Sequence, residues 1–169
     1  MVHLAPFRQE DSAILYGWLS DRSYRLESGG FGFVSRQQHD AWFEGIQKSS
    51  DGAVALAVRR TEDEKLVGLV QLVNINRTYR NAELRIRLAP TLGGKGYGTQ
   101  ATRLLCEHAF KDINLHRVYL YVRASNGRAV RCYEKVGFQQ EGCLRQHCFV
   151  DGDYDDFTVM GLLASELTL

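Results

Sequence analysis

The sequence predicts a mixed α+β fold in which one strand–helix–strand unit lies between antiparallel hairpins. Residues 81–90 alternate apolar and polar side chains with the two-residue period of a half-buried strand. Residues 97–110 then place apolar side chains at helical spacing, and residues 116–124 return to a β-rich composition. The dipeptide Asp151-Gly152 separates two further β-rich runs and is a strong hairpin signal. The segments from 81 to 124 therefore form a central βαβ unit.

The N-terminal part of the chain is expected to hold one strand and two helices. The strand spans residues 2–7, and a helix with a loose apolar pattern follows over residues 9–20. Residues 20–35 are rich in glycine and aromatic side chains, so we expect an irregular segment there. Ser35 begins the next helix, over residues 35–49, as its N-cap, and Gln38 occupies the capping-box position.

The middle of the chain is β-rich. Residues 53–60 and 66–77 are expected to pair as a hairpin across the charged turn 61–65. The strand that follows has one apolar face and one charged face. The apolar face carries Leu84, Ile86 and Leu88, and the charged face carries Glu83, Arg85 and Arg87.

The C-terminal part completes the βαβ unit and adds a hairpin. The helix expected after the glycines has an apolar stripe made of Ala101, Leu104, Leu105, His108 and Ala109. A strand over 116–124 and a helix over 126–138, ended by Gly137, come next. The last two strands, 143–150 and 153–163, meet across Asp151-Gly152.

Length and composition indicate one globular domain over residues 1–169. The chain is 44% apolar and 24% charged, which suits a single core of ordinary size. Its 21 Lys and Arg residues balance 20 Asp and Glu residues, so no net basic field favours a nucleic-acid partner. The sequence has neither a signal-peptide core nor an apolar run of about 18 residues. We therefore expect a cytoplasmic protein with no membrane partner.

The cysteines are expected to be packing residues in a reducing compartment, because they form no C-x-x-C pair. Cys143, His147 and Cys148 offer three metal ligands, but neighbouring residues on a strand point to opposite faces and a fourth ligand is lacking. We expect no metal site.

Four glycines occupy the six positions from Gly93 to Gly98, directly before the predicted helix. Glycine allows positive φ and close approach of the backbone to a ligand. A loop that ends at a helix N-terminus presents unpaired N–H groups and a positive dipole end, which together bind anions such as phosphate. Lys95 and Thr99 can add side-chain donors.

Three interpretations of this loop compete before any family is considered. A P-loop requires Ser or Thr after the lysine, and Gly96 follows Lys95 here, so that interpretation fails. Residues 96–101 formally match the G-x-G-x-x-A dinucleotide fingerprint, and Arg123 could accept the extra phosphate of NADP. The charged face of the preceding strand is unlike a parallel strand covered on both sides. The plain structural alternative is a surface turn without a ligand, which four glycines in six positions disfavour.

Two longer segments carry a resemblance to a known family. Residues 93–99 read GGKGYGT, and NLHRVYLYVRASNGRAVRCYEKVGF follows downstream. They resemble the GNAT superfamily of N-acetyltransferases. The first matches the family's pyrophosphate loop, Q/R-x-x-G-x-G/A, over Gly93 to Gly98, and Gly93 departs from the expected Gln or Arg, which removes one polar or charge-assisted contact. The second matches the segment in which an Asn opens a helix and a Tyr lies two turns later, here Asn126 and Tyr133.

Within the superfamily the chain is most similar to the branch of ribosomal-protein and spermidine acetyltransferases. The segments VGLVQLVNIN, NAELRIRLAP and EGCLRQHCFVDGDYDD carry this similarity. It spans about residues 66–160, whereas residues 1–60 agree only in general layout. The resemblance implies the acyl-CoA N-acyltransferase fold, a mixed and mostly antiparallel sheet flanked by helices.

The resemblance also implies acetyl-CoA as the cofactor and a placement for it. Its pyrophosphate would lie on the amides of Gly94, Lys95, Gly96, Tyr97, Gly98 and Thr99, which follow Gly93. Its pantetheine would lie along Ile86, Arg87 and Leu88 as an added strand. A backbone N–H near Leu88 would donate to the acetyl carbonyl in an oxyanion-type role.

Asn126 and Tyr133 are expected to face the same extended cofactor. Seven residues on a helix return to nearly the same face about 10 Å further along. Tyr133 is the candidate general acid for the leaving thiolate, since its ordinary pKa of about 10 lies above a thiol's of about 8.5, an uphill transfer of roughly 2 kcal/mol. Ala129, Cys132, Tyr133 and Val136 also form an apolar stripe, so a packed tyrosine is the structural alternative.

An acceptor amine with a pKa near 10 is only about 0.1% neutral at pH 7, so a base or a water chain must deprotonate it. Glu83 is the candidate general base, acting through water. An ion pair with Arg85 or Arg87 on the same strand face is the alternative.

The acceptor is expected to be a small-molecule primary amine, such as a polyamine, an aminosugar or an amino-acid-like compound, acetylated by direct transfer. Residues 21–35 and the acidic turn 151–156 are expected to wall its site, because loops over a rigid sheet commonly carry specificity. Gln71, Asn74 and Asn76 stand where spermidine acetyltransferases look acid-rich, which weighs against a polyamine. The alternatives are acetylation of a protein N-terminus, an NADP-binding oxidoreductase and a non-catalytic coenzyme A sensor. A homo-oligomer is compatible with each of them.

Overall fold

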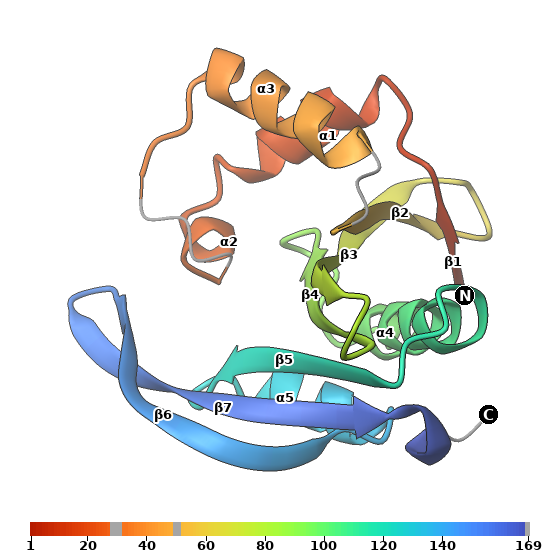
Figure 1. Cartoon of the computed structure of the whole chain (residues 1–169). Helices are drawn as coiled ribbons and strands as arrows, with labels where there is room; N and C mark the ends of the chain where they lie inside the picture. Colours follow the sequence, from red (N-terminus) through yellow and green to blue (C-terminus); the bar gives the residue numbers. More distant parts are fainter. Residues whose placement is uncertain (28–31, 49–51, 168–169) are drawn as a thin grey trace.

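A computed structural model of the chain describes residues 1–27, 32–48 and 52–167, and it contains one seven-stranded sheet with the order β1-β2-β3-β4-β5-β7-β6 (Figure 1). The strands are β1 (Val2–Ala5), β2 (Val54–Arg60), β3 (Leu66–Asn76), β4 (Asn81–Leu88), β5 (Arg117–Arg123), β6 (Gln139–Val150) and β7 (Asp153–Leu163). Every neighbouring pair is antiparallel except β4 and β5, which are parallel. The expected mixed, mostly antiparallel sheet with a central βαβ unit is confirmed.

Helices connect the strands on both sides of the sheet. They are α1 (Asp11–Trp18), α2 (Arg22–Glu27), α3 (Arg36–Gln47), α4 (Tyr97–Glu107) and α5 (Gly127–Glu134), with a π-helical turn over His108–Asp112 after α4 and a 3₁₀ turn over Ala164–Glu166. Ser35 caps α3, and the capping box with Gln38 forms as predicted. No helix in the described ranges is both long and apolar enough to cross a membrane.

The prediction of an irregular segment over residues 20–35 is wrong in part, because the helix α2 forms there. Asp21 begins this helix: its Oδ1 accepts a hydrogen bond from the backbone N–H of Tyr24 at 2.9 Å. Aspartate is a favoured N-cap residue, and the Asp21-Arg22-Ser23-Tyr24 run carried that signal. Residues 28–31 of the same segment lie outside the described residues.

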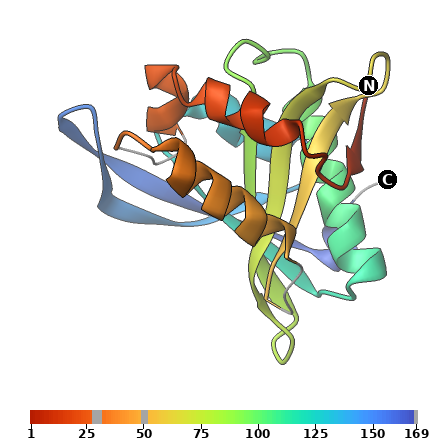
Figure 2. The same ribbon diagram turned by 90° about the horizontal axis from the view of Figure 1, so that it is seen from above.

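Two groups of buried side chains hold helices against opposite faces of the sheet. Leu69 of β3 packs with Leu15 of α1 and Phe43 of α3. Val70, the next residue of β3, belongs to the larger cluster that contains Leu105 of α4 and residues of α5. Successive residues of a strand point to opposite faces, so the two clusters follow from the alternation along β3. Figure 2 shows α1 and α3 in front of the sheet and α4 behind it.

The parallel pair at the centre of the sheet is short. The pairing of β4 with β5 joins Asn81 to Arg117, Ala82 to Val118 and Glu83 to Tyr119, and then stops. β4 continues to Leu88, paired on its other side with β3 as far as Gly68. β5 continues to Arg123, paired with β7. The sheet therefore opens into a wedge between the C-terminal halves of β4 and β5.

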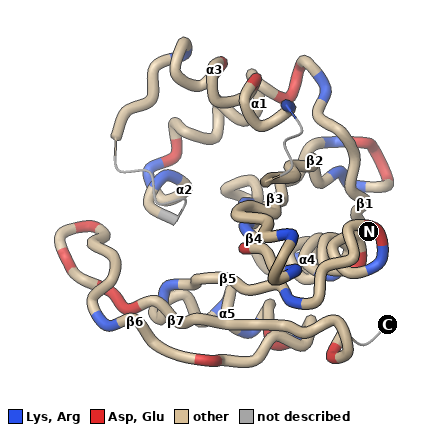
Figure 3. The backbone as a smooth tube through the Cα atoms, in the orientation of Figure 1, with Lys and Arg blue, Asp and Glu red and all other residues tan. Residues whose placement is uncertain are grey.

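The last two strands form a long hairpin that extends towards α2. Asp151 and Gly152 have φ angles of 55° and 93°, the positive values that a tight type I′ hairpin turn requires. β6 begins at Gln139, four residues earlier than predicted. Acidic residues gather at the tip of the hairpin, beside α2 (Figure 3).

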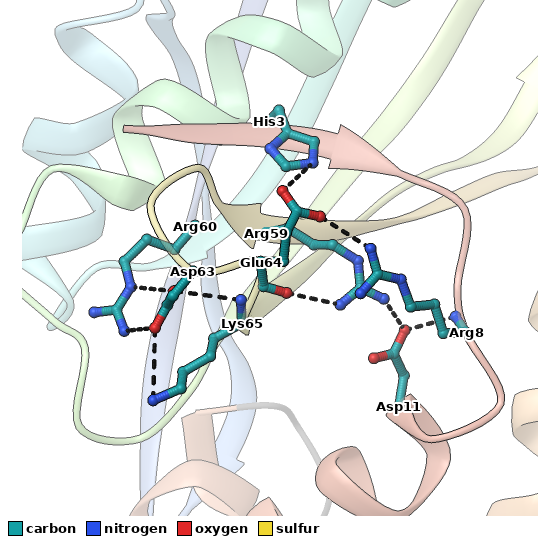
Figure 4. Close-up of polar contacts among 8 residues, drawn as sticks. All are labelled: His3, Arg8, Asp11, Arg59, Arg60, Asp63, Glu64 and Lys65. Atoms are coloured by element: carbon teal, nitrogen blue, oxygen red, sulfur yellow. Dashed lines mark hydrogen bonds and ion pairs between the residues drawn. The ribbon is translucent and has the colours of Figure 1, made fainter.

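A buried ion pair ties the start of α1 to β2 (Figure 4). Arg59 Nη2 donates to Asp11 Oδ2 at 2.6 Å, and the two side chains are 3% and 0% exposed. The backbone N–H of Arg8 donates to the same carboxylate oxygen at 2.7 Å, and Arg59 Nη1 donates to the carbonyl of Glu64 at 3.2 Å. A buried charge without its partner is strongly unfavourable, so each member of this pair depends on the other.

We expect Asp11→Ala to lower the free energy of unfolding by about 3–5 kcal/mol, because it leaves the Arg59 guanidinium buried without a counter-charge. The double variant Asp11→Ala/Arg59→Met should be less destabilised than Asp11→Ala alone. Urea denaturation followed by circular dichroism measures both. If the double variant loses as much free energy of unfolding as Asp11→Ala or more, the unpaired charge of Arg59 is not the cause of the destabilisation.

Candidate active site

The glycine loop runs from the end of β4 into α4. Gly94 and Gly96 have φ angles of 84° and 78°, which disfavour any residue with a Cβ, and the space above both is open. Gly96 is the N-cap of α4, and within the described chain no side chain caps this helix. The first turn of α4 also lacks an acidic residue. This arrangement suits a diphosphate, since nothing negative competes for the first-turn amides.

The strand leading to the loop has a free edge. Beyond Glu83 no strand of the described chain pairs with the side of β4 that faces β5, and this edge includes Ile86, Arg87 and Leu88. Ile86 packs against the larger core cluster, and burial lowers the pKa of Arg87 below its ordinary value. An extended ligand can pair with such an edge through its own amides.

The loop, the strand and α5 meet at the open end of the wedge. A Cβ added to Gly98 would lie 3.4 Å from both Leu88 Cδ1 and Cys132 Sγ. Thr99 Oγ1 lies 3.3 Å from the same sulfur, so the first turn of α4 contacts α5 directly. The structure thus brings α5 against a strand and a loop that lie more than thirty residues before it in the sequence.

Asn126 and Tyr133 lie at the two ends of α5. Asn126 caps the helix, and its Oδ1 accepts from the backbone N–H of Ala129 at 3.1 Å. Tyr133 is 9% exposed and packs against Phe138 with ring centroids 5.8 Å apart. Burial raises the pKa of Tyr133 above its ordinary value, so its hydroxyl stays protonated in the physiological range. Such a hydroxyl can donate a proton or a hydrogen bond. The ring of Tyr133 is also packed in the core, as the apolar stripe of its helix predicts.

Glu83 stands at the last β4–β5 pair, where the wedge begins. Its side chain is 10% exposed, and Oε1 accepts from Arg85 Nε at 2.6 Å. Oε2 accepts from Asn74 Nδ2 at 3.0 Å. The ion pair anticipated for this strand face is present, although Glu83 is buried rather than solvated.

A pocket of about 480 Å³ lies between α2 and the β6–β7 turn. Its lining residues are Ser23, Leu26, Arg123, Ser125, Val150, Asp151, Asp153, Tyr154 and Asp155. Asp151 of this lining forms an ion pair with Arg22 of α2, and the hydrogen bond from Arg22 holds the pKa of Asp151 below its ordinary value. The two segments expected to wall the acceptor site therefore do line one pocket, which is acidic on its hairpin side.

Several residues at the site escaped the sequence interpretation. Ser23 and Leu26 lie in the segment expected to wall the acceptor site, but their helix was not expected, and the N-cap signal at Asp21 could have indicated it. Ser125 bonds to Asp155, a contact between residues far apart in the chain that carries no sequence signal. Arg128 contacts Gly93: an added Cβ there would lie 2.2 Å from Arg128 Nη1.

The dinucleotide-binding alternative, with Arg123 as its phosphate ligand, is wrong. A doubly wound fold needs a parallel sheet around the glycine loop, whereas β4 is antiparallel to β3 and parallel to β5 over three residue pairs. Arg123 instead lines the acidic pocket. The described residues contain no group of three or more side chains suited to a metal ion.

Comparison with known proteins agrees with this geometry. The model of the acetyltransferase (GNAT) domain family matches residues 2–139. The spermidine N(1)-acetyltransferase of Vibrio cholerae is 33% identical over 158 residues, which cover 83% of this chain and 91% of that protein. The putative ribosomal N-acetyltransferase YdaF of Bacillus subtilis is 33% identical over 104 residues, covering 62% and 57%.

A solved structure shares the fold over nearly its whole length. The crystal structure of spermidine N-acetyltransferase from Vibrio cholerae in complex with CoA and spermine superposes with a TM-score of 0.89 and 27% identity. The alignment covers 98% of this chain and 96% of that one. The chain therefore belongs to the GNAT acetyltransferase family, and it is an acetyl-CoA-dependent N-acetyltransferase.

Proposed function

We propose that this enzyme acetylates a primary amine of a polyamine and that the acidic pocket between α2 and the β6–β7 turn receives it. The observation that carries this proposal is the group of three aspartates, Asp151, Asp153 and Asp155, in one pocket. Arg22 neutralises Asp151, whereas no ion pair among the described residues engages Asp153 or Asp155. Two carboxylates thus remain to attract ammonium groups. The names of the Vibrio cholerae relatives support the same class of substrate.

The lack of acidic side chains on β3 is a weak argument against a polyamine substrate, because the pocket contains aspartates from another strand. Gln71, Asn74 and Asn76 supply no charge, and Asn74 is already bonded to Glu83. The hairpin supplies carboxylates on the other wall of the site. Compensation for the ammonium groups then comes from β7 and its turn instead of β3.

We place the cofactor in the wedge between β4 and β5. Acetyl-CoA supplies the activated acetyl thioester. The amides from Gly94 to Thr99, with the side chains of Lys95 and Thr99, would hold its diphosphate. The free edge over Ile86–Leu88 would pair with pantetheine, Asn126 would contact the cofactor from the opposite wall, and the N–H near Leu88 would donate to the acetyl carbonyl.

Two side chains would move protons. Glu83 would accept the ammonium proton through water, and the bonds from Arg85 and Asn74 fix its carboxylate at the point where the strands part. Tyr133 would donate to the departing sulfur. Its burial keeps the hydroxyl protonated, as a donor requires.

We also propose that the chain self-associates, because the sheet ends in an exposed strand. β6 is an edge strand, and its hairpin exposes the rings of Phe149 and Tyr154, 51% and 66% respectively. Exposed edges and aromatic rings are typical of interfaces. Light scattering on the purified protein measures this.

An amine panel tests the acceptor class. Thiol release from acetyl-CoA should be fastest with spermidine or spermine, and slower by at least about tenfold in kcat/KM with monoamine aminosugars, neutral amino acids and N-terminal peptides without lysine, since polyamines present several ammonium groups to the aspartates. Preferred turnover of peptides would establish the protein N-terminus as the acceptor. Turnover of aminosugars or amino acids at a rate equal to that of spermidine would exclude a polyamine preference.

The pocket aspartates predict a charge-specific effect on KM. Asp153→Asn and Asp155→Asn should each raise the KM for spermidine by about three- to tenfold, because each removes an attraction of the order of 1 kcal/mol. A monoamine of similar length should be affected less. Glu62→Gln, an exposed acid in the β2–β3 turn, is the control. Equal effects on the monoamine and spermidine would place the polyamine elsewhere.

Tyr133→Phe should lower kcat by at least about tenfold and leave the Kd for CoA nearly unchanged, because only the proton donor is lost. Since burial raises the pKa of Tyr133, its deprotonation should produce no descending limb in kcat below about pH 9.5. Steady-state thiol release across pH and calorimetry measure both. Tyr79→Phe, at a ring 74% exposed in the β3–β4 turn, is the matched control. Unchanged turnover in Tyr133→Phe would remove the general-acid role.

A further inference from the structure

Arg128 occupies the place that a side chain at position 93 would need. It lies in the first turn of α5, and an added Cβ on Gly93 would stand 2.2 Å from its Nη1 and 3.0 Å from its Cζ. Real Cβ atoms essentially never come within 3.0 Å of another heavy atom, so a side chain at position 93 would displace the flexible end of this arginine from its present place. Gly93 lies in the loop after β4, and Arg128 follows β5, so the contact bridges the two walls of the wedge.

The surroundings of this contact are electropositive. The first turns of both α4 and α5 lack an acidic residue, and both helices direct their positive dipole ends to this end of the wedge. Lys95 lies two residues beyond Gly93 and is exposed. Thr99 Oγ1 lies 3.3 Å from Cys132 Sγ, a contact in which either group can donate, so Lys95 is the charged side chain that the loop itself provides.

A guanidinium suits a diphosphate better than a backbone amide alone. It carries a full charge and a rigid fork of donors that can bind two phosphate oxygens at once. Backbone amides supply only partial charges. The loop that contains Gly93 can therefore obtain a charged diphosphate ligand from a side chain of the neighbouring helix α5.

We propose that Arg128 binds the coenzyme diphosphate and supplies, from α5, the side-chain contact that Gly93 cannot make. Gly93 and Arg128 then form a matched pair, in which the missing side chain leaves room for the guanidinium. This inference rests on the proposed placement of the diphosphate at the glycine loop. It does not depend on the identity of the acceptor amine.

Calorimetric titration with CoA, dephospho-CoA and pantetheine tests the proposal without any turnover. Arg128→Ala and Arg128→Gln should each weaken CoA and dephospho-CoA by at least about tenfold, since both ligands carry the diphosphate. Pantetheine, which has no phosphate, should bind the variants and the unaltered protein alike. Arg77→Ala removes the same charge from the β3–β4 turn at the far end of β4, and it should change none of the three affinities.

The pairing with Gly93 gives a second, independent arm. In the Arg128→Ala background, Gly93→Gln should restore a large part of the lost affinity, because the space is then free for a polar side chain at position 93. In the presence of Arg128, the same Gly93→Gln change should weaken CoA binding by displacing the guanidinium. Thermal unfolding of each variant shows that the fold is retained, and the Arg128→Gln variant keeps a side chain over the glycine.

Three results would overturn the proposal, and they are distinguishable. A loss confined to CoA that spares dephospho-CoA would assign Arg128 to the 3′-phosphate. Unchanged CoA affinity in both Arg128 variants, with weaker CoA binding in Gly96→Val, would support the loop as the diphosphate site. It would show that Arg128 is not one of its ligands. Unchanged affinity in the Arg128 variants and in Gly96→Val together would exclude the loop as the diphosphate site.

Discussion

The early parting of β4 and β5 is the constraint on which the rest of the molecule depends. Two parallel strands inside a sheet would normally satisfy each other's backbone groups along their whole length. Here the ladder ends at Glu83 and Tyr119, while both strands remain paired on their outer sides. The separation leaves one backbone edge of β4 available to a ligand, and it directs the glycine loop and the start of α5 to the same open end.

Irregular backbone near the opening places the polar groups. β3 changes register between Val73 and Asn76, and Asn74 has a φ of 54°. Such a bulge redirects a side chain, and Asn74 here reaches Glu83 on the neighbouring strand. The net charge is only +1, but positive and negative side chains gather in two different places on the molecule. Arg128 and Lys95 surround the loop proposed for an anionic cofactor, and aspartates surround the pocket proposed for a cationic acceptor.

Local patterns in the sequence predicted most of the elements and the loop. The alternation in β4, the apolar stripe of α4, the capping box at Ser35 and the Asp151-Gly152 turn act over a few residues, so their signals survive without tertiary information. The depth of the wedge could not be predicted, because it depends on where pairing between distant strands stops. The contacts of Arg128 with Gly93 and of Ser125 with Asp155 join residues about thirty-five and thirty positions apart and leave no periodic trace. The α2 helix is six residues long, and the N-cap aspartate was the one feature of the sequence that indicated it.

A crystal structure of this chain with CoA tests the central claim most directly. The account predicts the diphosphate within hydrogen-bond distance of the amides between Gly94 and Thr99, and pantetheine paired with β4 on the edge that faces β5. Coenzyme bound at another surface, with those amides bonded to carbonyl groups of the protein, would contradict it.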